Sequence, residues 1–281
     1  MAITLAENNY GSSQIRLLRV SKQQGRHDIR EIAWSIRFEG DFEAAHIQGD
    51  NRKILPPDTL KNTVYALARQ HSIEPPENFG LHVIEHFLTY NPQVTQVFIE
   101  GSENVWGRVS HGAKPHASAF ARAGNEKRTS LLKGTREGTQ IRSGIENLAV
   151  LKTTNSAFED FKKDPYTTLQ EEDDGILSTV IHADWLYTEE DAEFGPLWYA
   201  VRQMLLETFV DHKSQSLQHT LYAMGEAILT NFENVGEIHL SLPSRHFHLA
   251  DLGPLGMDNP GTVFVPADEP HAVIEATLRK S

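Results

Sequence analysis

The sequence predicts an α+β protein with two similar halves, each an antiparallel sheet with its helices packed on one face. Two observations lead to this fold class. Segments that alternate apolar and polar residues are followed by apolar residues at helical spacing, and then by further alternating segments. This order, strand–strand–helix–helix–strand–strand, occurs once in each half of the 281 residues. We therefore expect two tandem domains, 1–140 and 141–281, with a boundary near residues 136–146.

The strand and helix patterns lie in corresponding places in the two halves. In the first half, strands are predicted at 13–22, 29–42, 94–106 and 128–136, and helices at 58–72 and 76–91. In the second half, strands are predicted at 144–155, 177–188, 235–252 and 271–280, and helices at 195–213 and 214–232. Asp58 or Thr59 is expected to cap the first helix, because a short polar side chain can accept a hydrogen bond from the free backbone N–H groups there.

An internal repeat supports the two halves. Residues 87–99 align with residues 228–240 at an offset of 141, and His71 falls on His212 at the same offset. The aligned apolar pairs are Leu88 with Leu229, Val94 with Val235, Val97 with Ile238, and Ile99 with Leu240. A shared register at half the chain length indicates tandem duplication. Each half would have open sheet edges, which oligomerisation can pair.

Composition narrows the classes of function. The net charge is −12 and the pI is near 5.6, so we expect no nucleic-acid partner and no anionic membrane partner. The absence of cysteine excludes disulfides, thiolate metal sites and cysteine nucleophiles. The N-terminal residues lack the charged-then-apolar order of a signal peptide, and no apolar run approaches the roughly 20 residues of a membrane helix. A cytoplasmic protein is expected.

The most informative stretch runs from Leu148 to Leu169. It contains Leu151-Lys152-Thr153 at the end of a predicted strand, then Ser156-x-Phe158, then Tyr166-Thr167-Thr168-Leu169. This pattern resembles the urate oxidase (uricase) family, in which an arginine follows six residues after the last leucine. Further stretches resemble the family in the same order, at 8–17, 42–69, 114–122, 214–229 and 239–252. The resemblance covers nearly the whole chain.

The resemblance has several implications for this chain. It implies two tandem T-fold (tunnelling-fold) domains per chain and a homotetramer that encloses a tunnel. It implies an oxidoreductase of purine metabolism that binds a small purine-like ligand and uses dioxygen as co-substrate. It also implies that no metal, flavin or other cofactor takes part.

Some site positions of the family are kept in this sequence. Phe158 falls where the family stacks an aromatic ring on the purine, and Gln218 falls where a glutamine binds the pyrimidine edge. Leu217 would offer its backbone beside that glutamine, and Leu169 would supply an apolar wall. Asp58 falls at the helix start that faces the ligand, and His246 falls on the relay histidine.

Four positions depart from the family's pattern. Gly175 replaces the arginine that clamps urate, Ser12 replaces a lysine, Pro57 replaces a threonine, and Ser244 replaces the asparagine that holds dioxygen or water. A lysine–threonine–histidine relay removes protons from urate before electron transfer. Proline has neither a hydroxyl nor an N–H, so Pro57 cannot take part in such a relay. Losing the arginine removes a charge-assisted contact of about 1.5–3 kcal/mol.

Three hypotheses for the function follow. The favoured one is a cofactor-independent oxidase of a urate-like N-heterocycle other than urate, with Phe158 and Gln218 holding the ring and His246 moving protons. The second is ordinary urate oxidation, with Lys61 or a neighbouring subunit replacing the missing groups. The third is a non-catalytic purine binder or structural tetramer.

Each site residue also has an ordinary structural interpretation. His246 would then be a structural histidine, Gln218 a surface residue and Phe158 a core residue. The acidic run from Gln170 to Gly175 is typical of a solvated loop more than of a metal site, so no metal is predicted.

Overall fold

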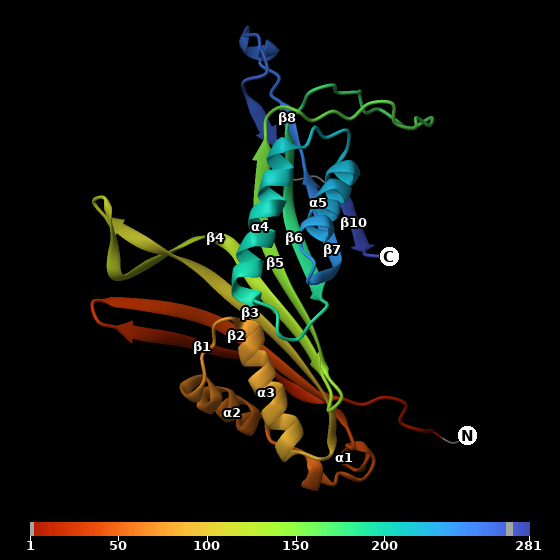
Figure 1. Cartoon of the computed structure of the whole chain (residues 1–281). Helices are drawn as coiled ribbons and strands as arrows, with labels where there is room; N and C mark the ends of the chain where they lie inside the picture. Colours follow the sequence, from red (N-terminus) through yellow and green to blue (C-terminus); the bar gives the residue numbers. More distant parts are fainter. Residues whose placement is uncertain (1–2, 268–271) are drawn as a thin grey trace. The chain divides into compact units, whose positions relative to one another are not determined.

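The computed structural model of the chain describes residues 3–267 and 272–281 (Figure 1). The chain forms two compact units: the first contains 1–145 and 185–199, and the second contains 146–184 and 200–281. Each unit combines antiparallel strands with packed helices, so the predicted α+β class is confirmed. The equal division at residue 140 stays a prediction.

The first unit is a sheet with the strand order β1-β2-β3-β4. Its elements are β1 (Tyr10–Gln23), β2 (Arg26–Gly40), α1 (Glu43–Gln48), η1 (Asn51–Lys53), α2 (Pro57–Gln70), α3 (Pro76–Tyr90), β3 (Val94–His111) and β4 (Lys114–Gly134). Helix α2 packs on β1, and α3 packs on β3 and β4 (Figure 1). The alternation in β2 predicts its buried face correctly, because its four inward side chains are at most 2% exposed: Ile32, Trp34, Ile36 and Phe38.

Two details of the first unit differ from the sequence prediction. The N-cap of α2 is Pro56 and the helix begins at Pro57, so the prediction of Asp58 or Thr59 as the cap is wrong. Proline suits the first helical position because its fixed φ matches the helix and its missing N–H would have no partner there. Strands β3 and β4 also run further than predicted, because their outer parts are exposed on both faces and lose the alternation.

The interior of the first unit holds a buried polar network. Glu77, fully buried in the first turn of α3, pairs with Arg128 of β4 over 2.7 Å. Ser143 donates a hydrogen bond to the Glu77 carboxylate and accepts one from the Tyr187 hydroxyl over 3.0 Å. Burial raises the pKa of Tyr187 to about 12, which keeps the hydroxyl protonated as a donor. The network therefore links a helix to three strands.

The second unit has the strand order β5-β6-β7-β10, with a separate two-stranded sheet of β8 and β9. Its elements are β5 (Thr139–Lys152), β6 (Leu177–Tyr187), α4 (Phe194–Asp211), α5 (Leu217–Asn231), β7 (Val235–Arg245), β8 (Phe247–Leu249), η2 (Gly253–Leu255), β9 (Phe264–Pro266) and β10 (Val273–Arg279), of which β5, β6 and α4 extend across the division between units. Helix α5 packs on β7 and β10 (Figure 1). The predicted strand 271–280 is observed as β10, while His271 lies outside the described residues.

Corresponding positions of the two units have the same surroundings. The repeat positions that enter β3 and β7 are all fully buried: Val94, Val97, Ile99, Val235, Ile238 and Leu240. His71, at the end of α2, stacks on His82 of α3 with ring centroids 4.2 Å apart. His212, which follows α4, contacts the ring of His219 in α5 at 4.3 Å. These shared features agree with the tandem layout expected from the sequence.

Candidate functional site

A hollow of about 490 Å³ lies within the second unit. It is bordered by the loop between β5 and β6, the start of α5, the end of β7 and the residues at the start of β10. Six of the predicted site residues line it: Phe158, Leu169, Leu217, Gln218, Ser244 and His246. Residues that lie far apart in the sequence are therefore brought to one concave surface, which is the usual form of a small-molecule site.

The first wall is the N-terminus of α5. The Ser216 side chain caps the helix by accepting from the His219 backbone N–H over 3.1 Å. Leu217 and Gln218 follow the cap, and both line the hollow. A helix N-terminus carries partial positive charge and free N–H groups. This wall therefore favours acceptor atoms of a ligand, with the Gln218 amide beside it.

The second wall is the loop between β5 and β6, which is held at both ends by backbone hydrogen bonds. Phe158 and Glu172 exchange two of them, with N···O distances of 2.7 and 3.2 Å. Next to this pair, the Gly175 N–H donates to the Ser156 carbonyl over 2.6 Å. Ala157 donates to the Ser214 carbonyl over 2.9 Å, which joins the loop to the segment before α5. The first two walls are thus tied together by main-chain bonds.

Phe158 presents an aromatic ring to this hollow. Its side chain is 41% exposed, so it is not a core residue. It stacks on Phe161 with ring centroids 5.0 Å apart and an interplanar angle of 13°. A large aromatic that stays half exposed in a pocket is suited to stacking on a flat ligand.

The third wall is the end of β7. The Ser244 N–H donates to the Ala272 carbonyl over 2.8 Å, which fixes the backbone there. The Ser244 hydroxyl lies 3.4 Å from Nε2 of His246, and His246 is exposed. A hydroxyl and an imidazole side by side can pass a proton or hold a water molecule between them. His246 is therefore not a buried structural histidine.

Gly175 is buried in the loop and is not among the described residues that line the hollow. The Glu172 carboxyl group covers it: a Cβ at position 175 would meet three atoms of that group at 2.3–2.5 Å. The Glu172 carboxyl group therefore occupies the space in which a side chain at position 175 would begin.

The acidic residues before Gly175 make different contacts. Glu171 pairs with Lys163 over 2.6 Å. Asp174 accepts from the Thr154 hydroxyl over 2.7 Å and from the Ser156 N–H over 3.3 Å, and the Thr154 contact in particular lowers its pKa. Glu172 is left to line the hollow. The described residues contain no group of three or more His, Cys, Asp or Glu side chains that could hold a metal ion.

Ser12 and Asp58 belong to the first unit and are not among the described residues that line this hollow. Ser12 lies at a bulge in β1, beside a different hollow of that unit. Asp58 lies in the first turn of α2, where it pairs with Lys61 and accepts from Asn62 over 3.0 Å. The Lys61 contact lowers the Asp58 pKa. Lys61, considered above as a replacement for a missing group, is therefore engaged with Asp58.

Sequence reasoning missed two charged residues of the hollow, Glu172 and Arg245. Glu172 is one of several acids in a loop without periodicity, and only its backbone pairing with Phe158 selects it. Arg245 lies between Ser244 and His246 in the sequence, and this adjacency could have marked it as a candidate site residue.

Lys152, part of the pattern that identified the family, has a structural task. Its ammonium group donates to the carbonyls of Phe209 and His212, over 3.2 and 2.5 Å, at the C-terminal end of α4. A cation is favourable there because the last carbonyls of a helix carry partial negative charge. Burial lowers the pKa of Lys152.

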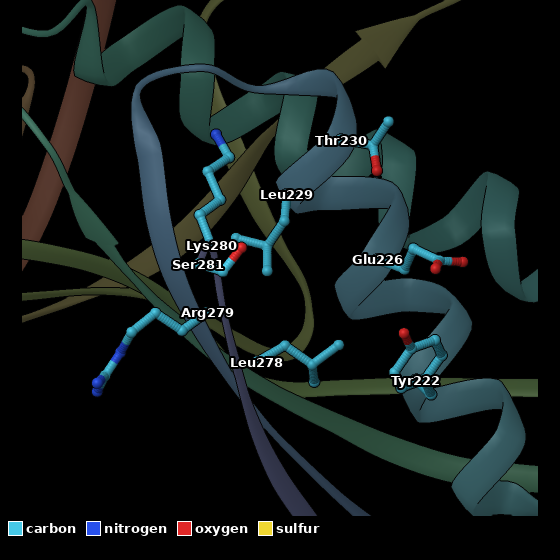
Figure 2. Close-up of a pocket in the computed structure, with 8 residues that line it drawn as sticks. All are labelled: Tyr222, Glu226, Leu229, Thr230, Leu278, Arg279, Lys280 and Ser281. Atoms are coloured by element: carbon cyan, nitrogen blue, oxygen red, sulfur yellow. The ribbon is translucent and has the colours of Figure 1, made fainter.

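A second hollow in the same unit lies between α5 and the end of the chain. Figure 2 shows Leu229 of the helix pointing toward Lys280 and Ser281, while Tyr222, Glu226 and Thr230 border the hollow on the same helix. Its two basic groups are already engaged, since Arg279 pairs with Glu237 over 2.5 Å and Lys280 donates to the Phe232 carbonyl over 2.8 Å. The first hollow is therefore the better candidate site.

Comparisons with known proteins all point to one family. The Uricase family model matches residues 8–133 and 141–275. A uricase from Arthrobacter globiformis is 40% identical over 278 residues, covering 99% of this chain and 90% of that protein. A uricase from Aspergillus flavus is 32% identical over 290 residues, covering 97% and 95%.

Solved structures give the same result. The crystal structure of the Arthrobacter globiformis uricase matches with a TM-score of 0.94 at 39% identity, covering 100% of this chain and 96% of that one. A uricase from Bacillus fastidious shares the fold, with a TM-score of 0.85 at 21% identity, covering 97% and 93%. The predicted architecture of tandem T-fold domains is confirmed by these matches.

Proposed function

Since the chain belongs to the uricase family and is on that account an oxidoreductase, we propose that it oxidises a flat, urate-like N-heterocycle in the hollow of the second unit. Dioxygen is the proposed electron acceptor, and no bound cofactor is proposed. The observation that carries this proposal is the gathering of six predicted residues around one hollow. In the described part of the chain, no helix is long and apolar enough to cross a membrane.

Each wall has a proposed task in holding the ring. Phe158 stacks on its face, which contributes about 0.5–1.5 kcal/mol beyond the burial of area. Gln218 offers both a donor and an acceptor to one edge of the ring, beside the free N–H groups of the helix start. Leu169 and Leu217 exclude water from the apolar part of the ring.

His246 is the proposed proton acceptor. Ring oxidation requires loss of protons before electrons pass to dioxygen, and imidazole titrates in the range in which such a base works. The Ser244 hydroxyl, 3.4 Å from Nε2, is the proposed partner that orients it or holds a water molecule between them. Ser12 and Asp58 are proposed to assist only if a second chain or a movement brings them to the hollow.

Urate itself is not the proposed preferred substrate. The family's arginine, lysine, threonine and asparagine are replaced by Gly175, Ser12, Pro57 and Ser244. A glycine and a proline offer no side-chain hydrogen bond, and the loss of a cation weakens the hold on an anion. A ring with less negative charge than urate fits the remaining residues better.

The assembly and location are part of the same proposal. We infer a homotetramer, in which the edge strands β1 and β10 find partners in neighbouring chains. A cytoplasmic location is proposed because the chain is acidic and has no cysteine.

The test is a panel of purines and pteridines offered to the purified chain. Binding is measured by calorimetry, and turnover by dioxygen uptake and by loss of the absorbance of the ring. The expected result is turnover of a ring other than urate, with urate far slower. Urate turnover at a rate typical of the family would instead establish the second candidate, ordinary urate oxidation, which the high identity to a named uricase favours. Absence of binding by any ring would overturn both.

A further inference from the structure

We propose that Glu172 sets the substrate class of the hollow by selecting a ring with an amidine-type edge, in which an exocyclic amine stands beside a ring N–H. This inference rests on the proposed function and adds which kind of purine or pteridine is taken. The 2-amino-oxo rings have this edge, whereas urate presents carbonyl oxygens and negative charge in its place.

Phe158 and Glu172 exchange both backbone hydrogen bonds, so they form a hydrogen-bonded antiparallel pair. The side chains of such a pair project from the same face of the two strands. Both residues line the hollow. A flat ring stacked on Phe158 would therefore have its edge toward the Glu172 carboxylate.

Of the four acids in the run, Glu172 is the one that lines the hollow. Glu171 is paired with Lys163, and Asp174 accepts from Thr154 and Ser156. Glu172 instead lies over the bare backbone of Gly175, with its carboxyl group where a side chain at 175 would begin. The space opened by the glycine is thus filled by a hydrogen-bond acceptor with negative charge.

A carboxylate offers two oxygens that can accept two parallel N–H groups, which is the geometry of an amidine or guanidine edge. The same carboxylate repels an anion that lies next to it. Gln218 and Arg245 also line the hollow and can donate to the carbonyl of such a ring. Donor and acceptor edges of a 2-amino-oxo ring therefore both find partners.

The experiment compares guanine with xanthine, which carry an amine and a carbonyl respectively at ring position 2, with a hydrogen on N3 accompanying the carbonyl. Their dissociation constants are measured by calorimetry on the full chain and on two variants, Glu172→Gln and Glu171→Gln. The second variant is the matched control, because it removes a carboxylate from the same loop but not from the hollow. Thermal unfolding checks that both variants fold.

The expected result is that the unchanged chain prefers guanine to xanthine and that Glu172→Gln weakens guanine binding by about tenfold or more. Xanthine binding should stay the same or strengthen, and Glu171→Gln should change neither constant by more than about twofold. Binding of oxopurines with no preference for guanine, unaltered in Glu172→Gln, overturns the inference and leaves the proposed function standing. Binding of no ring at all overturns the proposed function itself.

Discussion

Arg128 and Glu77 form an ion pair in the interior of the first unit, with Nη2 of Arg128 2.7 Å from Oε2 of Glu77. The side chains are 3% and 0% exposed. The guanidinium also lies over the Trp198 ring, 5.2 Å from its centroid, and the carboxylate accepts from Ser143. Removing either member of such a buried ion pair leaves the other charge unpaired, because water cannot reach it to replace the partner.

Arg128→Met is therefore expected to lower the free energy of unfolding by about 3–5 kcal/mol, measured by denaturant titration. The double variant with Glu77→Gln should recover part of this loss, since no lone charge stays buried. Arg279→Met is the surface control: its pair with Glu237 leaves Arg279 74% exposed, and the loss should be below about 1 kcal/mol. Equal losses in the two single variants would contradict the argument.

Lys152→Met should destabilise the end of α4. The variant leaves the carbonyls of Phe209 and His212 without their donor, at a cost of about 1.5–3 kcal/mol for hydrogen bonds to a charged group. Lys162→Met, at an exposed position of the loop, is the matched control and should be neutral within about 0.5 kcal/mol. Urea unfolding compares the two, and a neutral Lys152→Met would show that the cap is dispensable.

His212 should make the stability depend on pH. Burial, with the nearby His219 and Lys152, lowers its pKa in the folded protein. The unfolded chain then binds more protons than the folded one below about pH 6.5, so the free energy of unfolding should fall as the pH drops from there. His212→Asn should make this slope shallower in denaturant titrations repeated between about pH 7.5 and 5. His219→Gln, which removes the neighbouring charge, should reduce it in part.

Phe158→Ala should weaken ring binding without unfolding the protein, because its side chain is 41% exposed. The loss of stacking alone should raise the dissociation constant by roughly two- to tenfold. The loss of buried apolar area should raise it further. Tyr166→Ala is the control, since Tyr166 lies on the same loop, is 90% exposed and is not a lining residue of the hollow. The dissociation constant of the compound that binds most tightly in the panel is measured by calorimetry for both variants. Equal effects of the two substitutions would show that Phe158 is not part of the site.

The sequence predicted the strands and helices that have one buried apolar face and one exposed polar face. The alternation of Trp34 and Phe38 with polar residues marked a half-buried strand, and the helical spacing of Leu60 and Val64 marked a half-buried helix. The outer parts of β3 and β4 lacked such a contrast and were missed. The N-cap of α2 was also wrong, because proline at the first helical position competes with an acidic cap and the local sequence does not decide between them.

The site was predictable where it follows the family's pattern and not where it depends on distant pairing. Phe158 and Gln218 were found by position in that pattern, and both line the hollow. Glu172 was not, because an acid in an aperiodic loop is usually solvated, and only its backbone pairing with Phe158 places it at the hollow. The acidic run from Gln170 to Gly175 was visible in the sequence, but which of its acids lines the hollow was not.

The main-chain bonds that close the loop between β5 and β6 have a consequence for how this protein can change. Phe158 with Glu172, and Ser156 with Gly175, close the loop at its base, while its tip is a local turn in which Thr167 donates to the Asp164 carbonyl over 3.1 Å. Loop length changes the entropy of closure only slowly, so residues at the tip can be inserted or exchanged while the base keeps its geometry. The sequence of this loop can therefore change while its hydrogen-bonded base keeps the same geometry. Changes in this one surface loop would then let the same fold bind different rings.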